Sequence, residues 1–280
     1  MAVLLSLVGA VVFGVADFLG GFATKRSPLH AVIVLGQLAG LLVLAPAALL
    51  VLTRFDWGSA LWGAAAGIAG GVGLLAFYRC LATGTMSVVA PVTAVTAAAV
   101  PVLAGLALGE RPSGVTVVGV LLAVIAVVLV SAEGGRLPRW STLRHDRGVI
   151  GALLSGAAFG LFFVLLSRSA AGSGIVPVAA ARVTSISLVV GLALLLRRSL
   201  RPSRPGLPII LASGVADMTA NVLFLVATRQ GLLVVTSVLT ALYPASTVLL
   251  AQLVLHERLG RLKAGGLAVA AAAVTCIAVG

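Results

Sequence analysis

The chain has 280 residues, of which 61% are hydrophobic and only 9% are charged, and its mean hydropathy is +1.22. Its 19 basic and 7 acidic residues are too few to cover the surface of a water-soluble domain of this length. This composition excludes a soluble globular protein and predicts an all-α polytopic membrane protein, because about 20 apolar residues let a helix cross a hydrocarbon core of roughly 30 Å, and the alternating pattern of a membrane β-barrel is absent.

Charged residues and Gly/Pro punctuation divide the chain into ten apolar segments that we predict to be membrane-spanning helices. The first segment lacks a basic region before its apolar run and carries Asp17 near its end, so we interpret it as a retained span and not as a signal peptide. In chain order the segments run over approximately residues 2–22, 30–52, 58–78, 85–107, 113–132, 148–167, 176–196, 207–227, 232–254 and 263–279.

The two halves of the chain repeat one another at an offset of 147 residues, the difference between 257 and 110. We therefore predict a five-helix repeat over residues 1–132, a basic connecting loop over 133–147 and a second five-helix repeat over 148–280. Because five is odd, the second repeat enters the membrane from the opposite side, so the repeats are inverted. The offset aligns Glu110-Arg111 with Glu257-Arg258, Gly67 with Gly214, Phe77 with Phe224 and Gly119 with Gly266, and an offset of 146 aligns Phe13-Gly14 with Phe159-Gly160.

The distribution of basic residues predicts the orientation of the chain. Loops after odd-numbered segments contain 14 Lys or Arg residues, whereas loops after even-numbered segments contain 4. Because Lys and Arg are retained in the cytoplasm, we expect the odd-numbered loops there and both termini outside it. Most of the net charge of +12 then reflects topology, with anionic lipid headgroups as the partner. We do not expect nucleic-acid binding, which needs basic residues interleaved with aromatic ones.

Two of the seven acidic residues, Asp17 and Asp217, lie within predicted spans. A charge in the lipid interior costs on the order of 3 kcal/mol, so each carboxylate must face a wet cavity, be paired or be protonated. Asn221 follows Asp217 by four residues and projects from the same helix face. We hypothesise that Asp217 and Asn221 face Asp17 across a cavity and bind a proton or a cationic group of a substrate. The alternative is a structural ion pair between Asp217 and Arg182.

Other polar residues and prolines within the spans extend this candidate site. Arg182 either pairs inside the bundle or extends its side chain to the headgroups. Pro244 predicts a bend, because proline leaves a carbonyl one turn earlier without its donor. Such a carbonyl is satisfied in a membrane by neighbours or cavity water, so we expect this helix to line the interior, with Tyr243 facing the cavity. The further candidates are Gln37 and Tyr78 for the substrate or proton path and Pro91 and Pro101 for helix kinks.

Two glutamate–arginine pairs, Glu110-Arg111 and Glu257-Arg258, end the fourth span of each half. We interpret them as structural ion pairs near the membrane surface, with paired gate contacts as the alternative. The three histidines share no ligand spacing, and the chain has no phosphate-binding glycine loop and no serine with a nearby base in a span. We therefore expect no metal, no cofactor and no enzymatic activity.

The segment "YPASTVLLAQLVLHER" combines a proline in a polar helix, a run of small residues and leucine, and a glutamate at the helix end. With two inverted five-span halves, the chain resembles the EamA-type branch of the drug/metabolite transporter superfamily. Pro244, Glu257, Glu110 and the basic Arg182 match the pattern of that family, as do the Phe-Gly pairs in the first span of each half. The first half departs from it, because Ala97 stands where the proline is expected.

The resemblance implies a secondary-type transporter of a bacterial inner (plasma) membrane. It would export or exchange small metabolites, amino-acid-like or otherwise amphiphilic, by alternating access at a midplane cavity and without ATP. Multidrug efflux or flipping of lipid intermediates is the alternative within transport, and a membrane scaffold or sensor is the alternative outside it. The expected partners are a small-molecule substrate and the lipid bilayer. The fifth and tenth spans either form a homodimer interface or pack together within one chain.

Overall fold

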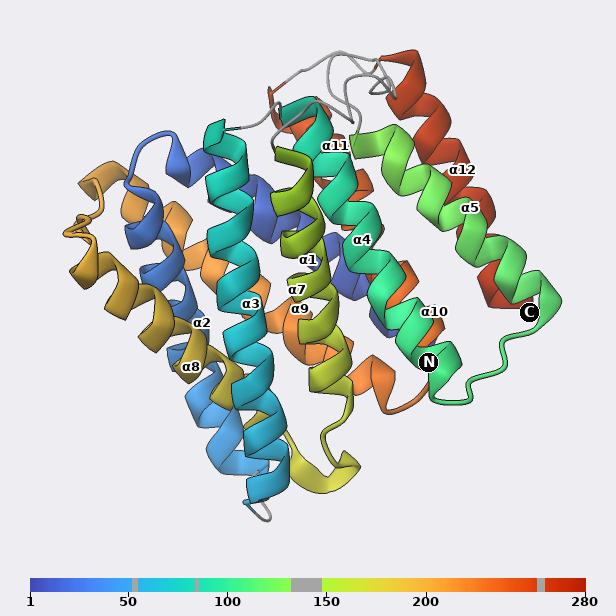
Figure 1. Cartoon of the computed structure of the whole chain (residues 1–280), viewed down its shortest axis with the longest axis horizontal. Coiled ribbons are helices and arrows are strands. Elements are labelled where there is room, and N and C mark those ends of the chain that lie inside the picture. Colours follow the sequence, from blue (N-terminus) through green and yellow to red (C-terminus); the bar gives the residue numbers. More distant parts are fainter. Residues whose placement is uncertain (52–54, 84–85, 132–147, 256–259) are drawn as a thin grey trace.

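The computed structural model describes residues 1–51, 55–83, 86–131, 148–255 and 260–280, and all regular structure in these ranges is helical (Figure 1). The all-α prediction is therefore confirmed for this part of the chain. The helices are α1 (Ala2–Thr24), α2 (Leu29–Val51), α3 (Trp57–Thr83), α4 (Met86–Ala107), α5 (Gly114–Ser131), α7 (Gly148–Ser167), α8 (Val176–Leu195), α9 (Leu207–Thr228), α10 (Leu233–Thr240), α11 (Tyr243–Leu255) and α12 (Arg261–Val279), with short 3-10 turns η2 (Ala171–Ser173) and η3 (Arg204–Gly206).

Eight helical stretches in the described ranges are long and apolar enough to cross a membrane. Two shorter apolar stretches, Leu29–Leu44 and Val92–Ala107, belong to α2 and α4. The described helices overlap each of the ten predicted segments, and the ninth segment is divided between α10 and α11. Large apolar side chains such as Leu61 and Leu121 are exposed on the outside of the bundle, where lipid replaces water. The chain is a multi-pass membrane protein.

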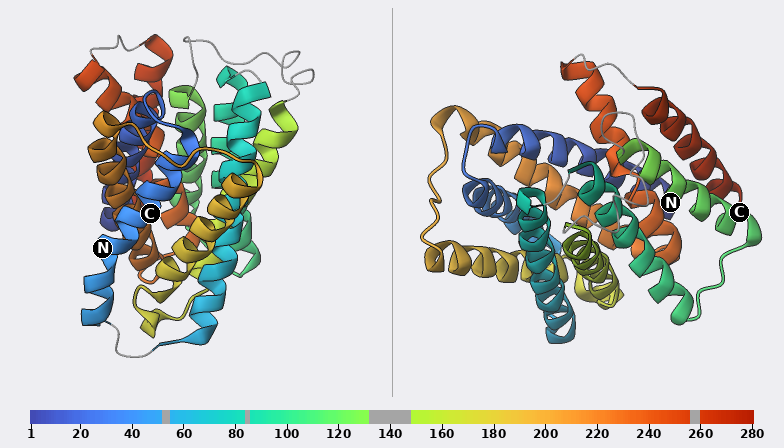
Figure 2. Two further views of the ribbon diagram at one scale, coloured as in Figure 1. Left: turned by 90° about the vertical axis from the view of Figure 1, so that its left-hand side faces the viewer. Right: turned by 45° about the horizontal axis from the view of Figure 1, so that its top comes forward.

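The two halves of the chain interlock and do not form separate lobes. Packing from one half to the other is extensive and joins α1 and α2 to α9, α3 to α7 and α8, α4 to α7, and α5 to α12. Two groups of helices result, which we call the first group (α1, α2 and α9) and the second group (α3, α7 and α8), and Figures 1 and 2 show them side by side. Each group contains helices from both halves of the chain, so the boundary predicted at 133–147 divides the sequence but does not divide these packing units.

Glycines that align in the two halves lie at corresponding helix crossings. Gly214 of α9 lies against the backbone of Gly36 on α2, and Gly67 of α3 lies against the backbone of Ala181 on α8. A Cβ atom at Gly214 or Gly67 would overlap the facing helix. Small residues at these crossings let the helix backbones approach closely, which supplies van der Waals packing where lipid removes the hydrophobic driving force.

The fifth and tenth predicted spans pack together within one chain. Gly119 of α5 lies against Ile277 of α12, and Gly266 of α12 lies against Val130 of α5. These two aligned glycines therefore make reciprocal contacts across one helix pair. Of the two interpretations of these spans, the structure has the intramolecular one, and a homodimer remains a prediction.

Candidate functional site

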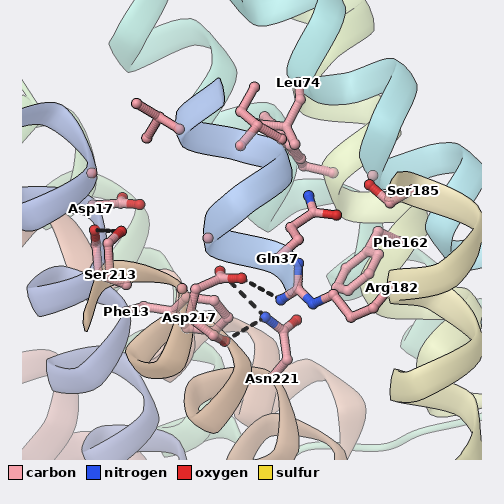
Figure 3. A pocket seen from close by; sticks show the side chains of 18 of the residues that line it. Phe13, Asp17, Gln37, Leu74, Phe162, Arg182, Ser185, Ser213, Asp217 and Asn221 are labelled. Atoms are coloured by element: carbon pink, nitrogen blue, oxygen red, sulfur yellow. Dashed lines mark hydrogen bonds and ion pairs between the residues drawn. The ribbon is translucent and has the colours of Figure 1, made fainter. Parts of the chain in front are cut away.

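A pocket of about 290 Å³ lies between the first and second groups (Figure 3). Its lining extends from Tyr243 and Phe163 to Thr24 and Val32, which lie next to the turn that joins α1 to α2. The pocket therefore reaches toward the membrane face that carries this turn. Its volume lies at the small end of the range for ligand pockets, which suits a small solute.

An ion pair joins the two groups of helices across the pocket. The guanidinium of Arg182 on α8 donates to the carboxylate of Asp217 on α9, and Nε of Arg182 lies 3.4 Å from Sδ of Met218. The side chain of Arg182 is only 11% exposed, whereas that of Asp217 is 34% exposed. Arg182 therefore forms an ion pair inside the bundle, as one of its two predicted roles required, and does not extend its side chain to the headgroups.

Asn221 lies one helical turn after Asp217 and is held by it. Its Nδ2 donates to the backbone carbonyl of Asp217 at 2.7 Å and lies 3.4 Å from Oδ1 of the same residue. These two acceptors fix the orientation of the amide, because the opposite orientation would place two oxygens against them. Oδ1 of Asn221 therefore points away from Asp217, and it has no hydrogen-bond partner in the described part of the chain.

Asp17 on α1 lines the same pocket but is bonded differently from Asp217. Its side chain is exposed, and within the described ranges it forms no ion pair and no hydrogen bond. The two carboxylates are close enough for their charges to interact. The structure thus brings Asp17, Asp217, Asn221 and Arg182 into one pocket, with one carboxylate paired and the other free.

Two further predicted residues line this pocket. Gln37 on α2 is 7% exposed, and its Oε1 has no partner among the described residues. Tyr243, at the start of α11, packs its ring 6.2 Å from that of Phe13. Tyr78 belongs to α3, but its side chain lies outside the described residues.

Aromatic rings close the deep end of the pocket. Phe163 of α7 packs against Phe13 of α1 with ring centroids 6.3 Å apart and against Phe224 of α9 at 4.5 Å. Phe224 is fully buried, and Leu166 and Leu225 are buried beside it in the same core cluster. Sequence analysis did not assign these phenylalanines to the site, although Phe13 and Phe224 both occur in the aligned pairs of the repeat.

A hydrogen-bond network lies at the face away from the pocket mouth. Arg229, after the end of α9, donates to the carbonyl of Ala170 at 3.2 Å and to Oγ of Ser173 at 2.9 Å. The amide of Ala170 donates to Oγ of Ser59 at 2.9 Å, and the amide of Ser59 donates to Asp56 at 2.8 Å. These bonds tie the end of α9 to the α7–α8 turn and to the start of α3, so the two groups are joined at this face.

The predicted kink prolines behave differently from one another. The ninth segment is interrupted at 241–242, and Pro244 is the second residue of the helix that follows, where a missing backbone N–H breaks no helical bond. By contrast, α4 runs without interruption through the positions of Pro91 and Pro101. The side chain of Pro91 lies outside the described residues.

Glu110 does not pair with Arg111. Its Oε1 accepts the backbone N–H of Leu233 at 2.6 Å, and its Oε2 accepts that of Val234 at 2.9 Å. The carboxylate therefore caps the N-terminus of α10, where free N–H groups and the helix dipole favour a negative charge. The aligned pair Glu257-Arg258 lies outside the described residues.

Replacing Glu110 with glutamine is expected to lower the free energy of unfolding by about 1–3 kcal/mol, because a neutral amide has one acceptor oxygen for two backbone donors. The thermal unfolding midpoint in detergent measures this loss. Arg111→Gln is the matched control, because Arg111 is exposed, and it should leave the midpoint nearly unchanged. Equal losses for both variants would contradict the capping role.

Comparison with known proteins identifies the family. The model of the EamA-like transporter family matches residues 1–132 and 146–279. A solved structure described only as "Crystal structure of protein" aligns with a TM-score of 0.78 and 18% sequence identity, covering 99% of this chain and 96% of its own, which shows a shared fold. No curated protein sequence matches the chain. Because the family match covers nearly all of its length, the chain belongs to the EamA-like transporter family, whose members are membrane transporters of small solutes.

Proposed function

We propose that this protein is a secondary transporter that moves a small amphiphilic solute across a bacterial inner membrane by alternating access. The pocket around Asp17, Asp217 and Arg182 is the solute site in this proposal. The observation that carries it is a free carboxylate, Asp17, next to an ion pair in a pocket that reaches one membrane face and is closed toward the other. An ionisable group within a membrane bundle marks a solute or ion pathway.

The direction of the opening supports a cytoplasm-facing state. The pocket mouth lies beside the turn that contains Lys25 and Arg26, and the basic segment between α8 and α9 joins this turn through a 3.0 Å contact between the hydroxyls of Ser27 and Ser203. Lys and Arg favour the cytoplasmic side, so both termini lie outside the cytoplasm in this proposal. The cluster of Phe13, Phe163 and Phe224 closes the outer side, together with the network of Arg229.

Corresponding contacts in the two halves support an inverted repeat of five helices. The crossing of Gly67 with α8 corresponds to that of Gly214 with α2, and α1 packs on α9 as α7 packs on α3. In an inverted repeat the opposite-facing state arises when the two repeats exchange conformations. Because each group contains helices from both halves, we infer that the first group moves against the second, which separates the three phenylalanines and releases Arg229.

The lining supports a small solute with an apolar part and a polar part. Phe13, Phe162 and Leu74 provide apolar walls, and the carboxylates and amides provide polar contacts. An amino-acid-like or similar metabolite fits this division, and the solute is exported or exchanged. The energy comes from a gradient, because a carboxylate that is held in a membrane and exposed to each side in turn can exchange a proton for a cationic group.

Counterflow in liposomes tests the transport function. Vesicles that contain the purified full chain and an unlabelled small amine or amino acid should accumulate the labelled solute, and Asp17→Asn should slow this exchange at least tenfold. Arg111→Gln is the control, because Arg111 is exposed and lies outside the pocket.

The outcomes of this experiment separate the alternatives. A scaffold or sensor would show no counterflow with any solute. A lipid flippase would move long-chain amphiphiles and not small solutes, and a multidrug exporter would accept bulky lipophilic cations of many shapes. Normal exchange by Asp17→Asn vesicles would contradict the assignment of the site.

A further inference from the structure

Two fully buried side-chain atoms that line the pocket have no hydrogen-bond partner among the described residues, and both are amide oxygens. Asn221 is 3% exposed and Gln37 is 7% exposed, and the amide oxygen of each has no partner among the described residues. The carboxylate of Asp17 is a third acceptor without a donor in these ranges. Buried acceptors are normally paired, so these oxygens indicate a ligand or water that donates hydrogen bonds.

The orientation of Asn221 makes this observation specific. Its Nδ2 already donates to the backbone carbonyl of Asp217 at 2.7 Å, so its free end must be the oxygen. The charge of Arg182 is already balanced, since its guanidinium donates to Asp217 and approaches Met218. The pocket therefore has no unpaired cation for an anionic group of a solute, and in Figure 3 the bonds among Arg182, Asp217 and Asn221 leave Asp17 outside the paired set.

The charge of the pocket agrees with its hydrogen-bonding groups. Arg182 and Asp217 neutralise each other, and Asp17, when ionised, adds one negative charge. A solute that matches this pocket carries one positive charge and several N–H donors on the charged group. A primary ammonium meets both requirements, because it has three donors and no acceptor. A quaternary ammonium has the charge but no donor.

We propose that the pocket selects primary amines, with Asp17 as the counter-ion of the ammonium group and the amide oxygens of Asn221 and Gln37 as its acceptors. The apolar part of the amine lies against Phe13 and Phe162. A carboxylate on the solute is not required, because Arg182 is held by Asp217. This inference rests on the proposed function only in taking the pocket as the solute site.

Binding of four matched probes to the purified full chain tests the proposal by titration calorimetry in detergent. The probes are 2-phenylethylamine, its N,N,N-trimethyl derivative, phenylalanine and 3-phenylpropanoate. We expect 2-phenylethylamine to bind, the trimethyl derivative and phenylalanine to bind at least tenfold more weakly, and 3-phenylpropanoate not to bind. Asp17→Asn should abolish amine binding, and Arg111→Gln should retain it.

Three results would overturn the selection of primary amines. Equal affinity for 2-phenylethylamine and its trimethyl derivative would show that the acceptors do not contribute. Tighter binding of phenylalanine would show that Arg182 leaves Asp217 to bind a carboxylate. Failure of 2-phenylethylamine to bind at millimolar concentration would reject the ligand class.

The binding assay and the counterflow assay fail independently. Amine binding without counterflow of any solute would reject transport and leave the amine site standing. If another solute shows counterflow that amines do not inhibit, and if amines do not bind to the protein, the amine site would be rejected and the transport function would stand.

Discussion

Replacing Asp217 with leucine is expected to lower the free energy of unfolding by about 3 kcal/mol, because it leaves the guanidinium of Arg182 as a buried cation without a counter-ion. The reverse change, Arg182→Leu, is expected to cost only about 1 kcal/mol. The reason is the difference in exposure: the side chain of Asp217 is 34% exposed in the pocket, where water stabilises a free carboxylate, whereas that of Arg182 is 11% exposed. Equilibrium unfolding in mixed detergent measures both values.

The double variant Asp217→Leu/Arg182→Leu provides the control for this prediction. Replacing both members of an ion pair with apolar side chains removes both desolvation penalties, so the double variant should be more stable than Asp217→Leu alone. The two residues are in contact, and a coupling free energy of about 1 kcal/mol or more is expected. Equal losses for the two single variants would contradict the asymmetric burial of the pair. Additive losses in the double variant would contradict the coupling between the two residues.

Replacing Gly214 with alanine is expected to destabilise the bundle by about 2–3 kcal/mol, because its Cβ would overlap the backbone of Gly36 and force α2 away from α9. Gly67→Ala should be similarly severe, because it would force α3 away from Ala181 of α8. Gly191→Ala is the matched control within a helix. A Cβ there meets nothing within 4 Å, so the better helix propensity of alanine should stabilise the protein by up to about 1 kcal/mol.

Thermal unfolding midpoints in one detergent compare these three glycine variants directly. A loss of stability for Gly191→Ala as large as that for Gly214→Ala would show that the effect is general to helical glycines and does not come from the crossing. A large loss for Gly214→Ala with none for Gly67→Ala would argue against equivalent crossings in the two halves.

The positions of the helices follow from the sequence, because the lipid environment leaves few alternatives. A segment such as 176–196 must satisfy its backbone groups internally, and the helix found there is Val176–Leu195. The same reasoning identifies Asp17, Asp217 and Arg182 as interior residues, since charges in lipid are costly. It does not determine which carboxylate Arg182 contacts, because that depends on how α8 and α9 pack.

Contacts between residues far apart in the chain were harder to predict. Glu110 lies 123 positions from Leu233 and caps its helix, whereas sequence proximity suggested a pair with Arg111. The aromatic closure has the same origin, because Phe13 and Phe224 meet through Phe163 only after helices of both halves interlock. The prolines differ because Pro244 lies in the first turn of a helix and Pro101 lies within one, a distinction that depends on the neighbouring backbone.

The interlocking of the two halves has a consequence for biosynthesis. α1 leaves the ribosome well before its main packing partner α9, which begins at Leu207. The helices of the first half must therefore wait in the bilayer with their glycine-lined faces uncovered until most of the chain has been translated. Long-range pairing of this kind slows assembly and exposes nascent chains to misassociation. Neither half expressed alone would have the neighbours that complete its packing.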